Sequence, residues 1–509
     1  MLCKKAVVYI TLICFIVCVQ GCYTSREFTV QQLEEKPEYT IQKIVTLDNE
    51  IYTFTDGGQF INDMIIGRVT DGEFVKIPIE QVRTIYIRTF GMSKGGKVVL
   101  LVVGVAALVA IVVATVGFLK TLDDLESSGS SCPFVYSFNG THYVLDGEPY
   151  GGAVCQGLQR TDFCRLDSLH PVDGEYRVLL ANELDEIQYT DEFKLLIVDH
   201  SKDVVVYQDA NGHFYTIGDM QKPLHIIDAD GNDQYQLLSA EDYLLWEAGI
   251  NNKELNTSSN LRDTLFITFP RPRHETKAKL IVNGCNTVWG SYMLKQMVSL
   301  YGNQVETWYE QMLAPEWQQF IEEWNDKVEL YQLQVHVWED SGWMHRGEVM
   351  GGGPLVSETR VAPIDLSGVR GDTVTIRVTP PRGFWQFNLF AIDYSDDVPV
   401  QIHEVSAKTA AAHNGTDICD KLEFSDCDYY IMPETGQEAF LVFSAPELQP
   451  DMERTIFAKV SGYYDLKINT DEPPQYEQIS RILLESDYAV IFSNNEFLEI
   501  LNQHATIQK

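Results

Sequence analysis

The feature that most constrains the fold is an uncharged apolar stretch of 22 residues, Val98–Leu119, bounded by Lys97 and Lys120. A helix needs about 20 predominantly apolar residues to cross a bilayer, so the stretch predicts a transmembrane helix over 98–119. Small residues such as Gly104 and Gly117 give this helix faces on which a second helix can pack closely. The segment therefore also predicts oligomerisation through 98–119.

A second apolar run, 6–19, follows Lys4 and Lys5. A basic start, a short apolar core and a small residue before the cleavage point predict a secretory signal peptide over 1–21. The ending Val19-Gln20-Gly21-Cys22 resembles the lipobox of bacterial lipoproteins, in which a peptidase cuts before a cysteine that carries diacylglycerol. The resemblance implies lipidation of Cys22 and a firm membrane anchor. A simple cleaved signal, with Cys22 incidental, is the alternative.

The two apolar segments conflict over topology. Four basic residues precede 98–119 between residues 83 and 97, and only Lys120 follows it, which predicts that residue 120 onward lies outside the cytoplasm. An exported residue 23 followed by a spanning helix would instead return the body to the cytoplasm. The export of residue 23 and an extracytoplasmic residue 120 are compatible if the helix crosses an outer membrane, forms a hairpin or packs in an oligomer. They are also compatible if the first segment is an uncleaved anchor. We expect an extracytoplasmic body anchored to lipid at the cell membrane or outer membrane.

The charge is concentrated in the body of the chain. The net charge is −35, from 38 basic and 73 acidic residues, and residues 1–119 are neutral overall. An acidic body repels phosphate backbones, which excludes nucleic acid as a partner. The length of 509 residues and the 45% hydrophobic content predict several domains with packed cores.

Six of the ten cysteines remain after the signal peptide and Cys22. An even remainder in an exported chain predicts disulfides, and free buried thiols are the alternative. The local pairs are Cys419 with Cys427, and one pair among Cys132, Cys155 and Cys164.

Short strands separated by turns fill residues 26–92. The strand-like runs are 42–47, 51–54, 64–69, 74–79 and 82–88, and Asp56-Gly57-Gly58 and Asp71-Gly72 are hairpin signals. Five strands in this length predict a small β-barrel domain. The stretch 67–79 resembles the small barrels of the Src-homology type, and this resemblance implies no activity.

A flexible linker is predicted over 120–131, followed by a β-rich domain over 132–250 and a C-terminal α+β region over 400–509. The β-rich domain opens with Cys132-Pro133-Phe134-Val135-Tyr136. Across 132–509 the chain resembles bacterial membrane lipoproteins that share this opening. The resemblance implies a location and no chemistry.

Residues 258–396 are predicted to form a β-sandwich. Val374, Ile376 and Val378 alternate with polar residues, as in a half-buried strand. A helical insert over 291–325 is expected, with a break at Ala314-Pro315. The runs Ile364–Ser367, Val374–Val378 and Gly383-Phe384-Trp385 resemble the galactose-binding-like (discoidin-type) jelly roll, which implies an eight-stranded double sheet with ligands at loops at one end. The insert departs from that pattern.

Tryptophan is concentrated in the same region, with seven of the eight residues between 289 and 385. Exposed aromatic rings can bind the apolar faces of sugars, which points to Trp343 and Trp385 as ligand-binding residues. The alternative is that these rings fill the core.

No catalytic residue, metal or cofactor is predicted. The carboxylates of Asp228–Asp233 lack the spacing of a helix–loop–helix calcium site and indicate a turn. No Gly-x-Ser-x-Gly motif is present, and His274-Glu275 lacks the second histidine of a zinc peptidase. The sequence therefore predicts a mainly β, multidomain envelope lipoprotein that binds or scaffolds a glycan or another envelope protein. The alternatives are a structural component of an oligomeric assembly and a carboxylate-dependent glycoside hydrolase.

Overall fold

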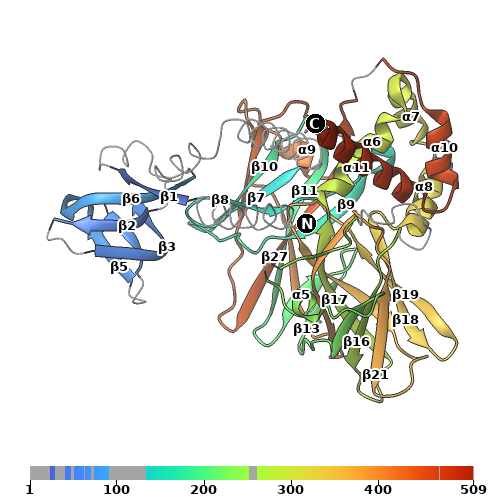
Figure 1. Cartoon of the computed structure of the whole chain (residues 1–509). Coiled ribbons are helices and arrows are strands. Elements are labelled where there is room, and N and C mark those ends of the chain that lie inside the picture. Colours follow the sequence, from blue (N-terminus) through green and yellow to red (C-terminus); the bar gives the residue numbers. More distant parts are fainter. Residues whose placement is uncertain are drawn as a thin grey trace, which may run out of the picture. The chain divides into compact units, whose positions relative to one another are not determined.

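The chain is mainly β and multidomain, as predicted, and forms two compact units, 1–116 and 117–509 (Figure 1). The predicted signal peptide 1–21, Cys22, the apolar segment 98–119 and the linker 120–131 lie outside the described residues. Within those residues no helix has both the length and the apolar character needed to cross a membrane. The structure is a computed structural model that describes residues 23–28, 41–47, 51–61, 64–69, 74–90, 133–242, 244–250, 261–468 and 471–507.

The N-terminal unit is one curved six-stranded sheet in the order β1-β6-β2-β3-β4-β5. Strand β3 pairs with β2 near its start and with β4 at its end, so the sheet bends around a core that includes Ile44, Phe54 and Ile85. Gly67 is required at this bend because a Cβ there would lie 2.6 Å from the Phe54 ring. The strands are β1 (Tyr23–Phe28), β2 (Ile41–Thr46), β3 (Ile51–Ile61), β4 (Met64–Arg68), β5 (Phe74–Pro78) and β6 (Val82–Phe90), with the 3-10 turn η1 (Ile79–Gln81).

The five predicted strands of this unit correspond to β2–β6, and β1 is an additional strand. Strand pairing among the described residues of this unit runs from β1 to β5, and the closure of these strands into a small barrel stays a prediction.

The second unit begins with a β-sandwich, here called the first sandwich. One sheet has the order β24-β26-β10-β7-β8, and the other has the order β23-β11-β27-β9 with β25 paired to β11. The elements from the N-terminal side are β7 (Phe134–Phe138), β8 (Tyr143–Gly147), η2 (Gln156–Leu158), β9 (Arg160–Arg165), β10 (Glu175–Asn182) and β11 (Glu186–Ser201). Those from the C-terminal side are β23 (Gln401–Ser406), β24 (Thr409–Ala412), α9 (Cys419–Leu422), β25 (Tyr430–Met432), β26 (Gln437–Ser444) and β27 (Met452–Leu466).

Two distant segments of the chain therefore build one domain. Strand β10 pairs with β26, and the 16-residue β11 pairs along its length with β27. Inward residues of both sheets, including Val178, Phe193, Leu441 and Val460, share one core. The structure thus differs from the predicted separation of 132–250 from 400–509, because the strands of each segment find their partners in the other.

A second sandwich is inserted between these segments. One sheet has the order β13-β12-β20-β17-β22-β15, with β12 parallel to β20, and the other has the order β14-β16-β21-β18-β19. The strands are β12 (Val205–Gln208), β13 (Phe214–Ile217), β14 (His225–Asp228), β15 (Trp246–Glu247), β16 (Leu265–Pro270), β17 (Lys277–Asn286), β18 (Gln332–Glu339), β19 (Gly342–Met350), β20 (Glu358–Asp365), β21 (Thr373–Val378) and β22 (Trp385–Asp393), with the short helix α5 (Tyr235–Leu238).

The core of the second sandwich follows the alternation seen in the sequence. Val374, Ile376 and Val378 are fully buried against residues of the opposite sheet such as Leu280 and Phe390. The second sandwich starts earlier than predicted, because β12 and β13 belong to it and not to the preceding β-rich segment.

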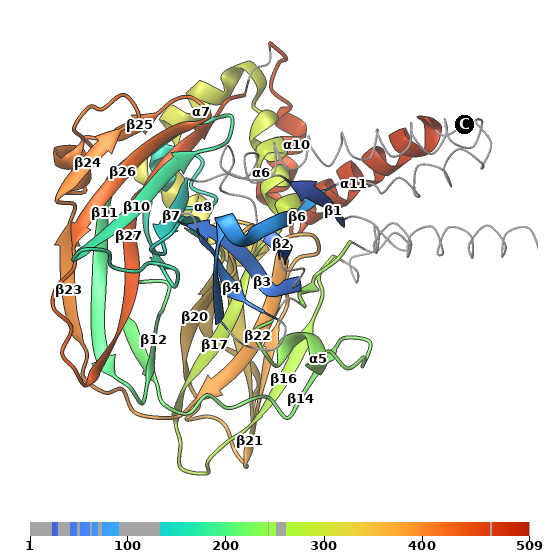
Figure 2. The same cartoon turned by 90° about the vertical axis from the view of Figure 1, so that its left-hand side faces the viewer.

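A layer of helices packs against one end of both cores (Figure 2). Met293 and Met297 enter the core of the second sandwich, whereas Val298 and Trp308 enter the core of the first. The helical segment is interrupted at Ala314-Pro315, as predicted. Ala314 is extended, and Pro315 lies in the first turn of the following helix, α8, where proline is tolerated. The helices are α6 (Val288–Ser299), η3 (Gly302–Gln304), α7 (Val305–Gln311), α8 (Pro315–Val328), α10 (Tyr476–Leu484) and α11 (Tyr488–Ile507).

Stability of the junction between this helical layer and β27 is expected to depend on pH. Burial raises the pKa of Asp465 to about 6, with a hydrogen bond from Tyr189 lowering it and the charge of Glu306 raising it. The unfolded chain therefore loses this proton at lower pH than the folded chain, so stability falls as pH rises from about 4 through 6. We expect Asp465→Asn to melt at a higher temperature than the wild type at pH 8, with the difference vanishing near pH 4. Asp471→Asn, which removes an exposed carboxylate further along the chain, is the control. A difference between Asp465→Asn and the wild type that is the same at both pH values would contradict the assignment.

Candidate ligand-binding site

Trp385, one of the two predicted ligand-binding residues, is a core residue. Its side chain is fully buried, its Nε1 donates a hydrogen bond to the Glu329 carbonyl oxygen at 2.8 Å, and its ring stacks on Phe387 at 5.6 Å. A ligand cannot reach it, so this prediction is wrong. The physical reason is that β22 is buried on both faces along nearly its whole length.

Trp343, the other predicted residue, lies on the outer surface of the sheet β14-β16-β21-β18-β19. Strand pairing aligns Trp343 with Trp338 and aligns His336 with Arg377 and with His345. Neighbouring Val335 and Val337 are fully buried, so the alternating residues of β18 point outward. We call Phe266, Trp338, Trp343 and Arg377 the aromatic face.

The rings of the aromatic face lie in contact with one another. Trp343 meets Trp338 edge to face, with ring centroids 5.2 Å apart, and meets Phe266 at 5.7 Å. Trp338 remains 52% exposed, an unusual exposure for the largest apolar side chain. A rigid aromatic surface open to solvent is therefore available to a ligand.

Arg377 adds a positive charge to this surface. Its guanidinium lies 4.6 Å from the centre of the Trp343 ring, in cation–π geometry. Its Nε is buried and makes no hydrogen bond, and no carboxylate of the described residues forms an ion pair with it. The carboxylate of Glu329, whose charge acts to raise the pKa of Arg377, forms an ion pair with Arg262. Burial lowers the pKa of Arg377, but a guanidinium remains charged at neutral pH.

His336 stands beside Arg377 as a neutral group. Burial, followed by the charges of Arg377 and His345, lowers the pKa of His336 to about 4. Its Nδ1 is buried and has no hydrogen-bond partner in the described part of the chain. At neutral pH the surface therefore combines one cation with an uncharged imidazole that can donate or accept a hydrogen bond.

Trp338 was not among the predicted ligand-binding residues, although its exposure makes it the most accessible ring of the aromatic face. The signal was present in the sequence, because Leu333, Val335 and Val337 alternate with Gln334, His336 and Trp338. This period of two places Trp338 on the polar, outward side of a strand.

Three tryptophans of the helical layer, Trp289, Trp308 and Trp324, pack within the protein. Trp289 donates to the Ser493 hydroxyl at 2.8 Å, and Trp324 donates to the Ile482 carbonyl at 2.9 Å. Trp308 is 7% exposed and stacks on Tyr301. For these residues the alternative prediction, that the tryptophan rings fill the protein core, describes the structure better than ligand binding.

The cysteines that the structure describes carry free thiols, and they are Cys155, Cys164, Cys285, Cys419 and Cys427. The expected bond between Cys419 and Cys427 is not formed. Cys132 lies outside the described residues, so its pairing stays a prediction. Burial raises the pKa of Cys155 to about 12, which keeps this thiol protonated and unreactive.

The acidic loop 228–233 is a turn closed on itself. The Asp228 carboxylate accepts hydrogen bonds from the backbone of Asp230 and Asn232 and from the side chains of Asn232 and Gln234. These bonds lower the pKa of Asp228 despite its partial burial. No group of three or more His, Cys, Asp or Glu residues within the described ranges is arranged to hold a metal ion.

Comparisons with known proteins give no information about the aromatic face. No protein-family model matches the chain, and no curated protein matches it significantly. One similar solved structure is described as "The Triple Jelly Roll Fold and Turret Assembly in an Archaeal Virus", with 7% identity, 60% coverage of this chain, 89% coverage of that chain and a TM-score of 0.12. A similarity this low carries no argument about fold or function.

Proposed function

We propose that this chain is a lipid-anchored binding protein of a bacterial cell envelope, and that the aromatic face binds an acidic glycan. The proposal joins a location expected from the sequence with a surface described in the folded body. It assigns no reaction to the protein.

The observation that carries the proposal is the unpaired guanidinium of Arg377, which stacks on Trp343, the ring that contacts the exposed Trp338. Aromatic rings can contact the apolar C–H face of a sugar, and a free guanidinium can bind a carboxylate in a bidentate manner. In a chain with 73 acidic residues, an arginine without a carboxylate partner is available for the carboxylate of a ligand. Uronic acid or another acidic sugar meets both requirements.

The anchoring part of the proposal rests on the lipobox-like sequence that ends at Cys22 and on the apolar segment 98–119. An anchored binding protein needs a site open to solvent, and Trp338 of the aromatic face is 52% exposed. A polysaccharide of the envelope or a glycan on another envelope component is the expected partner.

Trp338→Ala is expected to lower the affinity for an acidic oligosaccharide about tenfold, because a tryptophan that contacts the ligand contributes a large share of the binding energy. The measurement is binding of the full chain, in lipid nanodiscs, to an array of acidic and neutral oligosaccharides, followed by titration of the best ligand.

Phe440→Ala is the matched control, because Phe440 is an aromatic residue that is 43% exposed on the first sandwich. Its affinity should equal that of the wild type. If the array shows no acidic glycan bound, or if the two variants lose affinity equally, the proposed function is wrong.

A further inference from the structure

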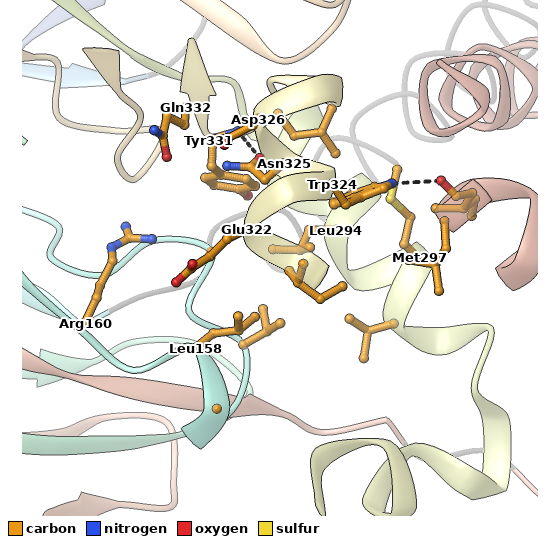
Figure 3. A pocket seen from close by; sticks show the side chains of 18 of the residues that line it. Leu158, Arg160, Leu294, Met297, Glu322, Trp324, Asn325, Asp326, Tyr331 and Gln332 are labelled. Atoms are coloured by element: carbon orange, nitrogen blue, oxygen red, sulfur yellow. Dashed lines mark hydrogen bonds between the residues drawn. The ribbon is translucent and has the colours of Figure 1, made fainter. Parts of the chain in front are cut away.

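A cavity of about 590 Å³ lies where the helical layer meets both sandwiches (Figure 3). Helices α6, α8 and α10 form one part of its wall, and the segment 152–160, Tyr301, Trp308 of α7, the start of β18 and the end of β19 contribute to the rest. Its volume is within the range of sites that hold small molecules, about 300–1,000 Å³. It is separate from the aromatic face, with which it shares no residue.

The interior of the cavity is apolar. Leucine, isoleucine, valine and methionine side chains from four different elements line it, with two tryptophans and a tyrosine among them. These residues are Val154, Leu158, Leu294, Met297, Val298, Tyr301, Trp308, Ile321, Trp324, Leu330, Ile479, Ile482 and Leu483. An apolar cavity of this size favours a hydrocarbon occupant over water.

One buried hydrogen-bond donor of the apolar wall lacks an acceptor. Trp308 is only 7% exposed, and its Nε1 is buried and has no partner in the described part of the chain. The ring of Tyr301, which also lines the cavity, stacks on Trp308 at 4.8 Å. A buried donor without an acceptor costs about 1–3 kcal/mol, so a ligand that brings an oxygen acceptor here is stabilised.

The polar side of the cavity carries charges of both signs. Figure 3 shows Arg160 and Glu322 on the side away from Met297. Arg160 uses Nε and Nη2 on Asp162 and on the Gly151 carbonyl oxygen, which leaves Nη1 without a hydrogen bond. The carboxylates of Glu322, Asp326 and Glu348 line the same cavity.

We propose that this cavity binds a single-chain lipid with an ester-linked acyl chain and a zwitterionic head group. The acyl chain occupies the apolar interior, and the ester carbonyl accepts a hydrogen bond from Trp308 Nε1. The phosphate of the head group meets Arg160 Nη1, and its ammonium meets the carboxylates. A fatty acid fits less well, because its own carboxylate would lie among three others.

A surface groove adjoins the cavity and shares one lining residue with it. A groove between α8 and α10 is lined by Trp317, Phe320, Leu483 and Leu484, and Leu483 also lines the cavity. Leu484 at the groove is 76% exposed. Such exposed apolar side chains are suited to take up an acyl chain from a lipid surface.

The test uses the full chain in lipid nanodiscs and two photoactivatable probes with the same diazirine-bearing acyl chain, a lysophosphatidylcholine and a free fatty acid. We expect the zwitterionic probe to label α6, α8 or α10, as mapped by mass spectrometry, at least fivefold more than the fatty acid. Leu294→Trp, which fills the cavity, is expected to reduce labelling at least fivefold. Leu313→Trp, the same change at a residue that is 50% exposed outside the cavity lining, should leave it unchanged.

A second variant keeps the proposal falsifiable if Leu294→Trp fails to fold. Trp308→Phe removes only the Nε1 donor and retains an aromatic ring, and we expect it to reduce labelling by the ester-linked probe more than labelling by the fatty acid. Equal labelling in the wild type and both cavity variants, or labelling confined to the outer groove, would overturn the proposal. Stronger labelling by the fatty acid would overturn the assigned head group.

Discussion

Replacement of Trp385 by alanine is expected to destabilise the second unit by about 3–5 kcal/mol, the usual cost of removing a large aromatic side chain from a packed core. Trp385 is fully buried and stacks on Phe387 at 5.6 Å. The substitution also removes the donor to the Glu329 carbonyl at 2.8 Å. The substitution therefore removes both a packed aromatic ring and a hydrogen bond at the start of β22.

The measurement is urea-induced unfolding of the full chain, followed by circular dichroism. Trp338→Ala is the control, because a side chain that is 52% exposed should change stability by less than about 1 kcal/mol. Trp385→Ala is thus expected to lower stability, whereas Trp338→Ala is expected to lower glycan affinity. A Trp385→Ala variant that keeps wild-type stability and loses glycan binding would restore Trp385 as a ligand residue and contradict the buried position described here.

The Arg454→Met variant is expected to lose a comparable amount, about 3–5 kcal/mol, because it leaves a buried carboxylate without its partner. Arg454 on β27 contacts Asp199 on β11 through two hydrogen bonds of 2.6 Å and 2.7 Å. Asp199 is 3% exposed. The pair joins the two distant segments that form the first sandwich.

The paired substitution Asp199→Asn with Arg454→Met tests the cause. Removing both charges should recover most of the lost stability in thermal unfolding, because no uncompensated charge remains. Lys408→Met is the control, since Lys408 pairs with Glu175 in a solvent-exposed position, where such pairs contribute about 0–1 kcal/mol. A loss for Arg454→Met as small as that of the control would show that β11 and β27 do not pair as described.

Local pattern in the sequence predicted many of the strands and helices correctly, but it could not predict which strands pair. The alternation of Val374, Ile376 and Val378 and the break at Pro315 are both present in the structure. Pairing of Val178 with Leu441 depends on the three-dimensional complementarity of segments more than 250 residues apart, which periodicity does not encode. The predicted division at residue 400 therefore missed the discontinuous first sandwich.

The aromatic face was predicted only in part, for a related reason. Trp343 was identified from composition alone, which cannot distinguish the two faces of a strand. Strand periodicity would have added Trp338, whose neighbours alternate cleanly, but it could not have removed Trp385, because β22 is buried on both faces. The unpaired state of Arg377 depends on which carboxylates lie near it in space and has no sequence signal.

Calorimetric titration of one acidic oligosaccharide and its carboxyl-reduced, neutral counterpart tests the proposed function most directly. The wild type should bind the acidic form at least tenfold more tightly, since a hydrogen bond to a charged group contributes about 1.5–3 kcal/mol. Arg377→Met should bind both forms equally weakly, whereas Arg273→Met, which removes an exposed arginine at another turn, should behave as the wild type. Equal affinity of the wild type for both forms, or unchanged preference in Arg377→Met, would contradict the assignment of the aromatic face as an acidic-glycan site.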